Sequence, residues 1–273
     1  MHKDSLKVWR IEKGRREEIE LADLSTLDAV TRQLPEGFYS TFRTFQSGTR
    51  VLGLKAHLQR LFGPLSKTEV GEEELRRHLR ELLKDYPAEA RVRAIMTRSG
   101  ALYAAIEPLK ALPREIYEHG VRLQTIDMAR ESPRLKSTAF IQASRGEREQ
   151  LARQGIFEAL LVKNGRILEG MTSNFFYVIG AVLYTAKHGV LPGVTRQALI
   201  RAAREGGMEV RYKSLKRDQL NIPHEAFITS SSRGVVPVIQ IDGVRIGQGR
   251  PGRITKQAAE MYEEYVKAKA EKI

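Results

Sequence analysis

The central and C-terminal parts of the chain combine residues that could hold a negatively charged ligand. Glu169 ends an apolar run and leads into the small polar run 172–174. Thr195 follows Pro192-Gly193 at the expected start of a helix, where free backbone N–H groups and the helix dipole favour a phosphate. Residues 230–232 are three consecutive serines. A carboxylate, a phosphate-favouring helix start and a hydroxyl-rich loop suit a phosphorylated heterocyclic cofactor, which also requires a lysine for covalent attachment.

The sequence lacks the residue patterns of several other kinds of functional site. The chain has no cysteine, and its six histidines are scattered without metal-ligand spacing, so we expect no metal site. No G-x-S-x-G motif of a serine hydrolase is present. Residues 247–252 match G-x-G-x-x-G, but too few residues follow for the remainder of a βαβ unit, so we expect a structural loop there.

The elements around these residues are predicted by turn and helix signals. Asn164-Gly165 between apolar runs predicts a hairpin with a type I′ turn, because both turn residues need positive φ. A second strand pair is expected at 175–179 and 182–185. The stretch 196–205 predicts a helix that ends at Gly206-Gly207.

The N-terminal part predicts a separate lobe. Strands are expected at 38–45, 91–97 and 101–106, with helices from Leu54 to Leu61 and over about 72–84. The proline-bracketed stretch 108–113 marks a boundary. We therefore predict an N-terminal lobe at 1–112, a connector at 113–120 and a C-terminal lobe at 121–273. The C-terminal lobe is expected to contain strands at 121–126, 226–229 and 235–241, a polar helical stretch at 139–154 and a terminal helix at about 255–269.

The composition is that of an ordinary globular protein, with 41% hydrophobic and 29% charged residues. The formal charge of +13 invites a nucleic-acid interpretation. However, the arginines are spread along the chain and interleaved with glutamates, as in 72–77, which is typical of a solvated surface. No secretory signal or run long enough to span a membrane is visible, so we expect a cytoplasmic protein that binds neither membrane nor nucleic acid.

Four motifs in order resemble one enzyme family. They are EGMTSNFF at 169–176, LPGVTR at 191–196, the pattern I-D-G…I-G-x-G-x-P-G…T over 241–255 and HLQRL at 57–61. These strings are similar to signatures of the class IV, fold-type IV pyridoxal-phosphate aminotransferases. The resemblance extends from about residue 37 to 262.

The resemblance implies an α/β (α+β) fold of two lobes. The smaller N-terminal α/β lobe would pack on a larger C-terminal lobe with a β-barrel-like core, and pyridoxal 5'-phosphate would lie between them. It also implies a homodimer in which the partner closes the pocket.

Residue roles follow from the same resemblance. Lys136, 33 residues before Glu169, would be the catalytic Schiff-base lysine, and Glu169 would face the pyridine nitrogen. The implied cofactor-binding residues are Arg60, Lys136, Glu169, Ser173, Asn174, Val194, Thr195, Ser231 and Ser232. The candidates for binding the substrate are Arg43, Arg98, Ser232 and Arg233.

The implied activity is ping-pong transfer of an amino group from an amino acid, expected to be an apolar or branched-chain L-form, to 2-oxoglutarate. The amino-acid and oxo-acid substrates would be its small-molecule partners. One departure from the family pattern and one similarity to a related enzyme leave an alternative open. Ile141 stands where branched-chain members commonly have a tyrosine, and Gly37–Arg43 is similar to a stretch of aminodeoxychorismate lyases. A 4-amino-4-deoxychorismate lyase is therefore the alternative, and a non-enzymatic anion or nucleic-acid binder is a more distant one.

Overall fold

The computed structural model describes residues 5–86 and 88–273, which form two compact units. Unit 1 consists of the described residues up to Lys110, Leu135–Ala143 and Lys269–Ile273, and unit 2 consists of Ala111–Arg134 and Ser144–Ala268.

The division near residue 110 lies close to the boundary expected from the sequence. However, neither unit is a single continuous stretch of the chain. Two stretches of the predicted C-terminal lobe, residues 135–143 and 269–273, group with unit 1, and the first contains Lys136. The expected connector at 113–120 largely forms a short helix of unit 2, α4 (Arg114–His119).

Unit 1 is built on an antiparallel sheet. In pairing order its strands are β16 (Glu271–Lys272), β4 (Arg50–Val51), β3 (Gly37–Phe45), β5 (Ala90–Thr97), β6 (Leu102–Pro108), β1 (Lys7–Glu12) and β2 (Arg15–Glu18). Its helices are α1 (Leu27–Gln33), α2 (Leu54–Phe62), α3 (Glu72–Leu82) and α5 (Ala139–Ala143), and the 3₁₀ helix η1 (Leu83–Asp85) follows α3.

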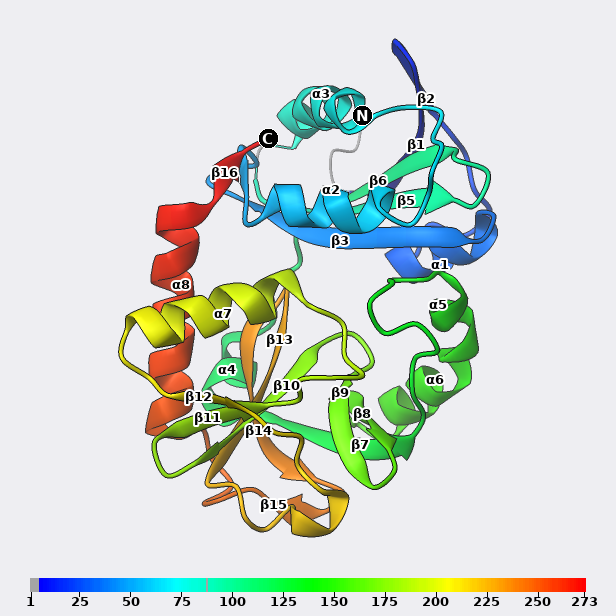
Figure 1. The fold of residues 1–273 in the computed structure, drawn as a ribbon. Helices are drawn as coiled ribbons and strands as arrows, with labels where there is room; N and C mark the ends of the chain where they lie inside the picture. The colour runs from blue at the N-terminus through cyan, green and yellow to red at the C-terminus, as the bar shows by residue number, and fades with distance from the viewer. Residues whose placement is uncertain (1–4, 87) are drawn as a thin grey trace. The chain divides into compact units, whose positions relative to one another are not determined.

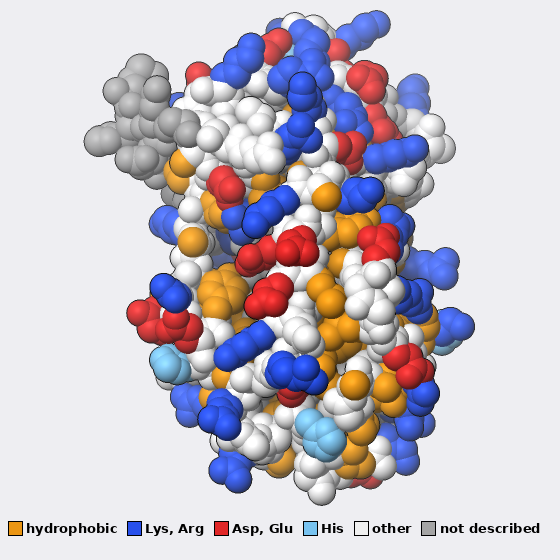
Figure 2. Space-filling view, turned by 90° about the vertical axis from the view of Figure 1, so that its left-hand side faces the viewer, with side chains coloured by type: hydrophobic (Ala, Val, Ile, Leu, Met, Phe, Trp, Pro, Cys, Tyr) orange, Lys and Arg blue, Asp and Glu red, His pale blue; other side chains and the backbone are white. Residues whose placement is uncertain are grey.

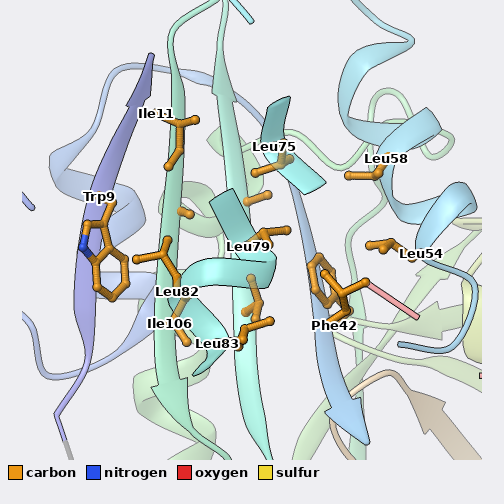
Figure 3. Close-up of a cluster of buried hydrophobic side chains, with 14 of the residues drawn as sticks. Trp9, Ile11, Phe42, Leu54, Leu58, Leu75, Leu79, Leu82, Leu83 and Ile106 are labelled. Atoms are coloured by element: carbon orange, nitrogen blue, oxygen red, sulfur yellow. The ribbon is translucent and has the colours of Figure 1, made fainter. Parts of the chain in front are cut away.

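Side chains alternate across β3, so the sheet contributes to a core on each face. Phe42 packs with α2 and α3 in one cluster, whereas Tyr39 packs with α1 and α5 in the other. Figure 3 shows the first cluster, in which leucines of α2 and α3 lie over the strands. The helix α3 has acids in its first turn and Leu75, Leu79 and Leu82 on its buried side, as its sequence pattern predicts.

Unit 2 contains a closed sheet. The ring runs through β10 (Asn174–Ile179), β13 (Glu225–Ser230), β14 (Gly234–Ile241), β7 (Val121–Asp127), β8 (Glu158–Lys163) and β9 (Arg166–Gly170), and β9 pairs again with β10. The strands β11 (Val182–Thr185), β12 (Val210–Tyr212) and β15 (Val244–Arg245) extend it. Its other helices are α6 (Arg145–Arg153), α7 (Val194–Glu205), α8 (Arg253–Lys269) and the 3₁₀ helix η2 (Arg217–Gln219). The closed ring confirms the predicted barrel-like core (Figure 1).

Local turn chemistry explains the ring's tightest connection. Asn164 and Gly165 both have positive φ, 51° and 68°, which a type I′ turn requires. The turn sets the register of β8 and β9, with Lys163 opposite Arg166. At the far end of this hairpin β9 delivers Glu169 and Gly170.

Charges of both signs share the surface. Figure 2 shows Lys and Arg side chains interspersed with Asp and Glu on one face of the molecule. Ion pairs such as Lys7–Glu18, Arg114–Glu118 and Arg145–Glu149 agree with the expected solvated surface. None of the helices in 5–86 and 88–273 is long and apolar enough to cross a membrane.

Candidate active site

Lys136 is anchored by its backbone to the edge of β3. Its carbonyl accepts a hydrogen bond of 2.9 Å from the Tyr39 N–H, and Ser137 forms a bridge with Phe38. The Lys136 Nζ lies 5.0 Å from the centroid of the Tyr39 ring, within the range of a cation–π contact. The half-buried lysine is therefore fixed both at its backbone and at its amine.

The helix α2 places a buried histidine one turn before Arg60. The His57 side chain is only 1% exposed, and its Nδ1 lies 2.8 Å from the Ser40 Oγ on β3. Burial lowers the pKa of His57 well below its usual value, and the charges of Arg60 and Lys136 lower it further. The imidazole is therefore neutral near pH 7. The cationic charge in this part of unit 1 comes from Arg60 and Lys136.

The two arginines expected to bind a substrate carboxylate are also in unit 1, and the guanidinium of Arg98 lies 5.8 Å from the centroid of the Phe38 ring. Arg43 pairs with Glu89 and stacks over Phe45 at 4.7 Å. It stands four residues along β3 from Tyr39, a separation of about 13 Å. The side chain of Arg98 is 64% exposed and lies 3.8 Å from Glu36. That Arg43 and Arg98 bind the substrate carboxylate stays a prediction from their residue type.

A third arginine, Arg93, was not singled out from the sequence. Its Nη1 donates to Asp28 Oδ1 at 2.7 Å and to Thr31 Oγ1 at 2.9 Å. Its guanidinium also lies 4.7 Å from the Tyr39 ring. Tyr39 thus contacts two cations, Arg93 and Lys136, and the tight bonding of Arg93 fixes the position of the ring.

Glu169 is held in a buried cradle in unit 2. Its side chain is 2% exposed and pairs with Arg130, whose side chain is 5% exposed, at 3.0 Å. Its other oxygen accepts from Asn174 Nδ2 and from the Leu191 N–H, both at 2.9 Å. The cradle fixes the orientation of a charged carboxylate that would be costly to bury without these partners. The prediction from sequence included Asn174 but not Arg130.

Two glycines permit the close packing around this cradle. A Cβ on Gly193 would lie 2.1 Å from the Asn174 Oδ1. A Cβ on Gly170 would lie 2.2 Å from the Ser173 Oγ and 2.8 Å from Glu158 Oε1. Neither position has room for a side chain, which explains the glycines of the EG and LPG motifs.

The start of α7 is the part of unit 2 most suited to a phosphate. The helix has 12 residues beginning at Val194, and its N-cap, Gly193, provides no side-chain cap. Backbone N–H groups in the first turn of such a helix are available to an anion. The Thr195 hydroxyl lies 3.4 Å from the Ser231 hydroxyl, so the turn after β13 adds a hydroxyl to the helix start.

Two of the remaining predicted residues, Ser173 and Arg233, contact a second buried acid, Glu158. The Ser173 hydroxyl donates to Glu158 Oε2 at 3.1 Å, and Arg233 Nη2 lies 3.2 Å from the same oxygen. Ser232 lies in the same turn as Arg233 and is half-buried. Glu158 was missed from the sequence, although a lone acid at the head of the apolar run 159–162 was a usable signal.

The predicted residues therefore fall into two groups. Unit 1 contains Arg43, Arg60, Arg98 and Lys136. Unit 2 contains Glu169, Ser173, Asn174, Val194, Thr195, Ser231, Ser232 and Arg233. Within unit 2 the structure joins Glu169 to Asn174, and Thr195 to Ser231. In the described part of the chain no group of three or more His, Asp or Glu side chains could hold a metal ion.

The comparisons with known proteins agree on one family. Residues 37–241 match the family model described as amino-transferase class IV. The chain is 27% identical to the branched-chain-amino-acid aminotransferase of Pseudomonas aeruginosa, over 86% of this chain and 85% of that protein. Several other curated relatives match over only about a third of their own length. One is the D-alanine aminotransferase of Bacillus licheniformis, 38% identical over 37% of this chain and 36% of the relative.

The comparison with solved structures also finds aminotransferases. A crystal structure of the T.th. branched-chain amino acid aminotransferase, which contains pyridoxamine 5'-phosphate, superimposes with a TM-score of 0.80 at 25% identity. The superposition covers 97% of this chain and 95% of the other. With the family model matching three quarters of its length, this chain belongs to the class IV aminotransferase family.

Proposed function

We propose that the chain is a pyridoxal-phosphate-dependent aminotransferase. It would transfer the amino group of an apolar or branched-chain L-amino acid to 2-oxoglutarate by a ping-pong mechanism. The observation that supports this best is the Glu169 cradle, in which a buried carboxylate is oriented by Arg130, Asn174 and the Leu191 N–H. The branched-chain relatives favour the substrate class.

The donor set fits the cofactor. A fixed carboxylate is the group that keeps a proton on a pyridine nitrogen, and Glu169 supplies it. The uncapped start of α7, with the Thr195 and Ser231 hydroxyls beside it, suits a phosphate. The family resemblance implies that Arg60 would supply a guanidinium for this phosphate as well. When bound, pyridoxal phosphate would supply a ring that accepts electrons from the substrate.

Each residue of the proposed site then has a defined task. The Lys136 amine is the attachment point, and once released by the substrate amine it would move the proton from the substrate Cα. Tyr39 and the β3 edge keep this amine in place. The Glu169 carboxylate would keep the ring nitrogen protonated. This protonation matters most when charge develops in the transition state. We further propose that the enzyme is a homodimer, which light scattering of the purified protein would test.

The decisive experiment is a half-reaction followed by absorbance. Purified holoenzyme is mixed with a panel of L- and D-amino acids, without any oxo-acid. We expect an apolar L-amino acid to convert the cofactor to its amine form, and 2-oxoglutarate to reverse the change. Borohydride should fix the cofactor on Lys136, and Lys136→Ala should prevent this, whereas Lys163→Ala at the exposed end of β8 should not.

One sequence feature favours a second candidate. The lyase-like stretch Gly37–Arg43 forms β3, the strand that anchors Lys136. If no amino acid in the panel reacts, yet aminodeoxychorismate yields pyruvate and 4-aminobenzoate, the lyase is the correct function. A protein that binds no pyridoxal phosphate would refute both.

A further inference from the structure

Unit 2 contains a second buried carboxylate that the proposed reaction does not use. Glu158 is the first residue of β8, and its side chain is 4% exposed. Its Oε1 accepts from both the backbone N–H and the hydroxyl of Thr172, the latter at 2.9 Å. Its Oε2 accepts from the Ser173 hydroxyl at 3.1 Å and from Arg233 Nη2 at 3.2 Å. A buried carboxylate with this many donors is a built site, because burial is costly without them.

Arg233 extends this site to the turn that follows β13. Its Nη2 also donates to the Thr172 hydroxyl at 2.6 Å, and its Nε donates to the Ser230 hydroxyl at 2.9 Å. The guanidinium lies 5.2 Å from the centroid of the Phe157 ring, and the Arg233 carbonyl accepts a hydrogen bond of 2.9 Å from the Tyr117 hydroxyl. The arginine therefore bonds to both loops, 171–173 and 230–233.

Both loops belong to the proposed cofactor site. The first loop leads into Asn174, which orients Glu169. The second presents Ser231 beside Thr195 at the start of α7. Gly170, just before the first loop, packs closely against Ser173 and Glu158, since a Cβ there would lie 2.2 Å from the Ser173 Oγ and 2.8 Å from Glu158 Oε1. The position of the second loop against the first is set by the pair Glu158–Arg233.

We propose that the Glu158–Arg233 pair is a clamp that positions Ser231 at the start of α7 and so determines how tightly the cofactor phosphate is held. Arg233 is then a positioning residue and not a ligand of the substrate carboxylate. If it turned to a substrate, Glu158 would stay buried without its cation, which is strongly unfavourable. The proposal rests on the proposed function for the identity of the ligand.

The test compares Glu158→Gln, Arg233→Met and the double variant. Apoenzyme is titrated with pyridoxal 5'-phosphate at equilibrium, and KM for the amino acid is measured separately. We expect each single variant to raise the cofactor Kd about tenfold, which corresponds to about 1.4 kcal/mol, with little change in KM. The double variant should be no worse than either single variant, because both remove the same interaction.

Hydrogen exchange provides a readout that does not depend on activity. In Glu158→Gln the amides of 171–173 and 230–233 should exchange faster, including the Thr172 N–H that donates to Glu158. The matched control is Asp127→Asn, which breaks an exposed pair with Arg217 in the same unit (76% and 45% exposed) and should change neither quantity. Arg233→Lys keeps the charge without the fork, so its Kd should lie between those of the wild type and Arg233→Met.

Two results would overturn the clamp. One is an increase in KM for the amino acid in Arg233→Met, with the cofactor Kd unchanged and Glu158→Gln behaving as wild type, because Arg233 would then be a substrate ligand. The other is full additivity of the two single effects on Kd. A wild-type protein that takes up no pyridoxal phosphate would instead refute the proposed function, and with it the phosphate role of the clamp.

Discussion

At the residue scale, the Glu169–Arg130 pair shows how the protein keeps a charge inside unit 2. Both side chains are nearly inaccessible, at 2% and 5% exposure. Removing one partner of such a pair leaves the other charge buried, whereas removing both does not.

The first prediction is that Arg130→Met destabilises the protein by about 3–5 kcal/mol. The double variant Arg130→Met with Glu169→Gln should recover much of this loss. Urea unfolding of the apo forms measures both, and equal stability of the two variants would contradict the pairing.

Glu169→Gln alone separates binding from chemistry. Because the benefit of the carboxylate appears mainly as charge develops in the transition state, we expect the amino-transfer rate to fall much more than the cofactor affinity. Titration with pyridoxal phosphate and single-turnover kinetics give the two quantities. Equal losses in both, with an unchanged rate for the bound enzyme, would make Glu169 a structural contact only.

His57 predicts a pH effect on stability. Its pKa is lowered in the folded protein by burial, then by Arg60 and Lys136, whereas the unfolded chain has the usual value of about 6.5. Below that value the unfolded chain takes up a proton that the folded protein does not bind. Stability contributed by the neutral His57 is therefore present above about pH 6.5 and falls below it, by up to about 1.4 kcal/mol per pH unit. Unfolding at pH 8 and pH 5 should show this loss, and His57→Asn should reduce the difference. An unchanged difference in the variant would refute it.

Residue types predicted some members of the site and missed others for identifiable reasons. Glu169 and Asn174 stand in a recognisable string, so their proximity could be expected, and the structure shows it. Arg130 could not be found, because the chain has 46 lysines and arginines and nothing local distinguishes this one. Glu158 lies eleven residues before Glu169 on the neighbouring strand, so its contact with Arg233 depends on how the barrel closes.

At the scale of elements, local signals predicted the hairpins and helices well, because turn residues and apolar periodicity are local properties. The Asn164-Gly165 turn has the expected positive φ values, and α7 begins two residues before the predicted start. The polar helical stretch expected at 139–154 is instead two helices, α5 and α6, divided at Ser144. The chain passes from unit 1 to unit 2 at this residue.

The close packing of Gly193, the N-cap of α7, against Asn174, the first residue of β10, leads to the next prediction. Gly193 precedes α7, and a Cβ there would meet the Asn174 amide oxygen at 2.1 Å. Gly193→Ala should therefore push Asn174 away from Glu169 and cost about 1–3 kcal/mol of stability. Cofactor affinity should fall as well, because the same residue starts the phosphate-favouring helix. Gly146→Ala is the control. It lies in α6 with nothing within 4 Å and should stabilise by about 0.5 kcal/mol. Thermal unfolding of both variants decides, and a harmless Gly193→Ala would exclude this packing.

At the scale of the whole molecule, the chain order differs from the spatial grouping. Unit 1 is assembled from three stretches of sequence, of which the second contains Lys136 and the third contains β16. Composition and prolines predicted a single boundary near residue 110, since such signals mark linkers. They carry no information about a strand or a short segment that returns to an earlier unit. That return depends on pairing between residues more than two hundred positions apart, such as Val51 with Glu271.

The returning strand β16 fastens the segment that leads into α2. Its Glu271 accepts a hydrogen bond of 3.1 Å from the Lys55 N–H in the first turn of that helix. Arg50 on β4 donates to the Ala270 carbonyl at 2.7 Å, and Arg80 on α3 donates to the Ile273 carbonyl at 2.9 Å. The segment 269–273 therefore supports the helix that presents His57 and Arg60.

The last prediction follows from the burial of Ile273. Its side chain is 7% exposed and belongs to the cluster formed by α2, α3 and the sheet of unit 1. Ile273→Ala should destabilise the protein by about 2 kcal/mol, the lower end of the range for a buried isoleucine. Because β16 pairs with β4 just before α2, amides of α2 should exchange faster in this variant. Lys272→Ala, at the exposed neighbouring residue that ends β16, should leave both the exchange and the stability unchanged. Hydrogen exchange by mass spectrometry resolves the two outcomes. Identical exchange of α2 in both variants would show that the strand does not support this helix.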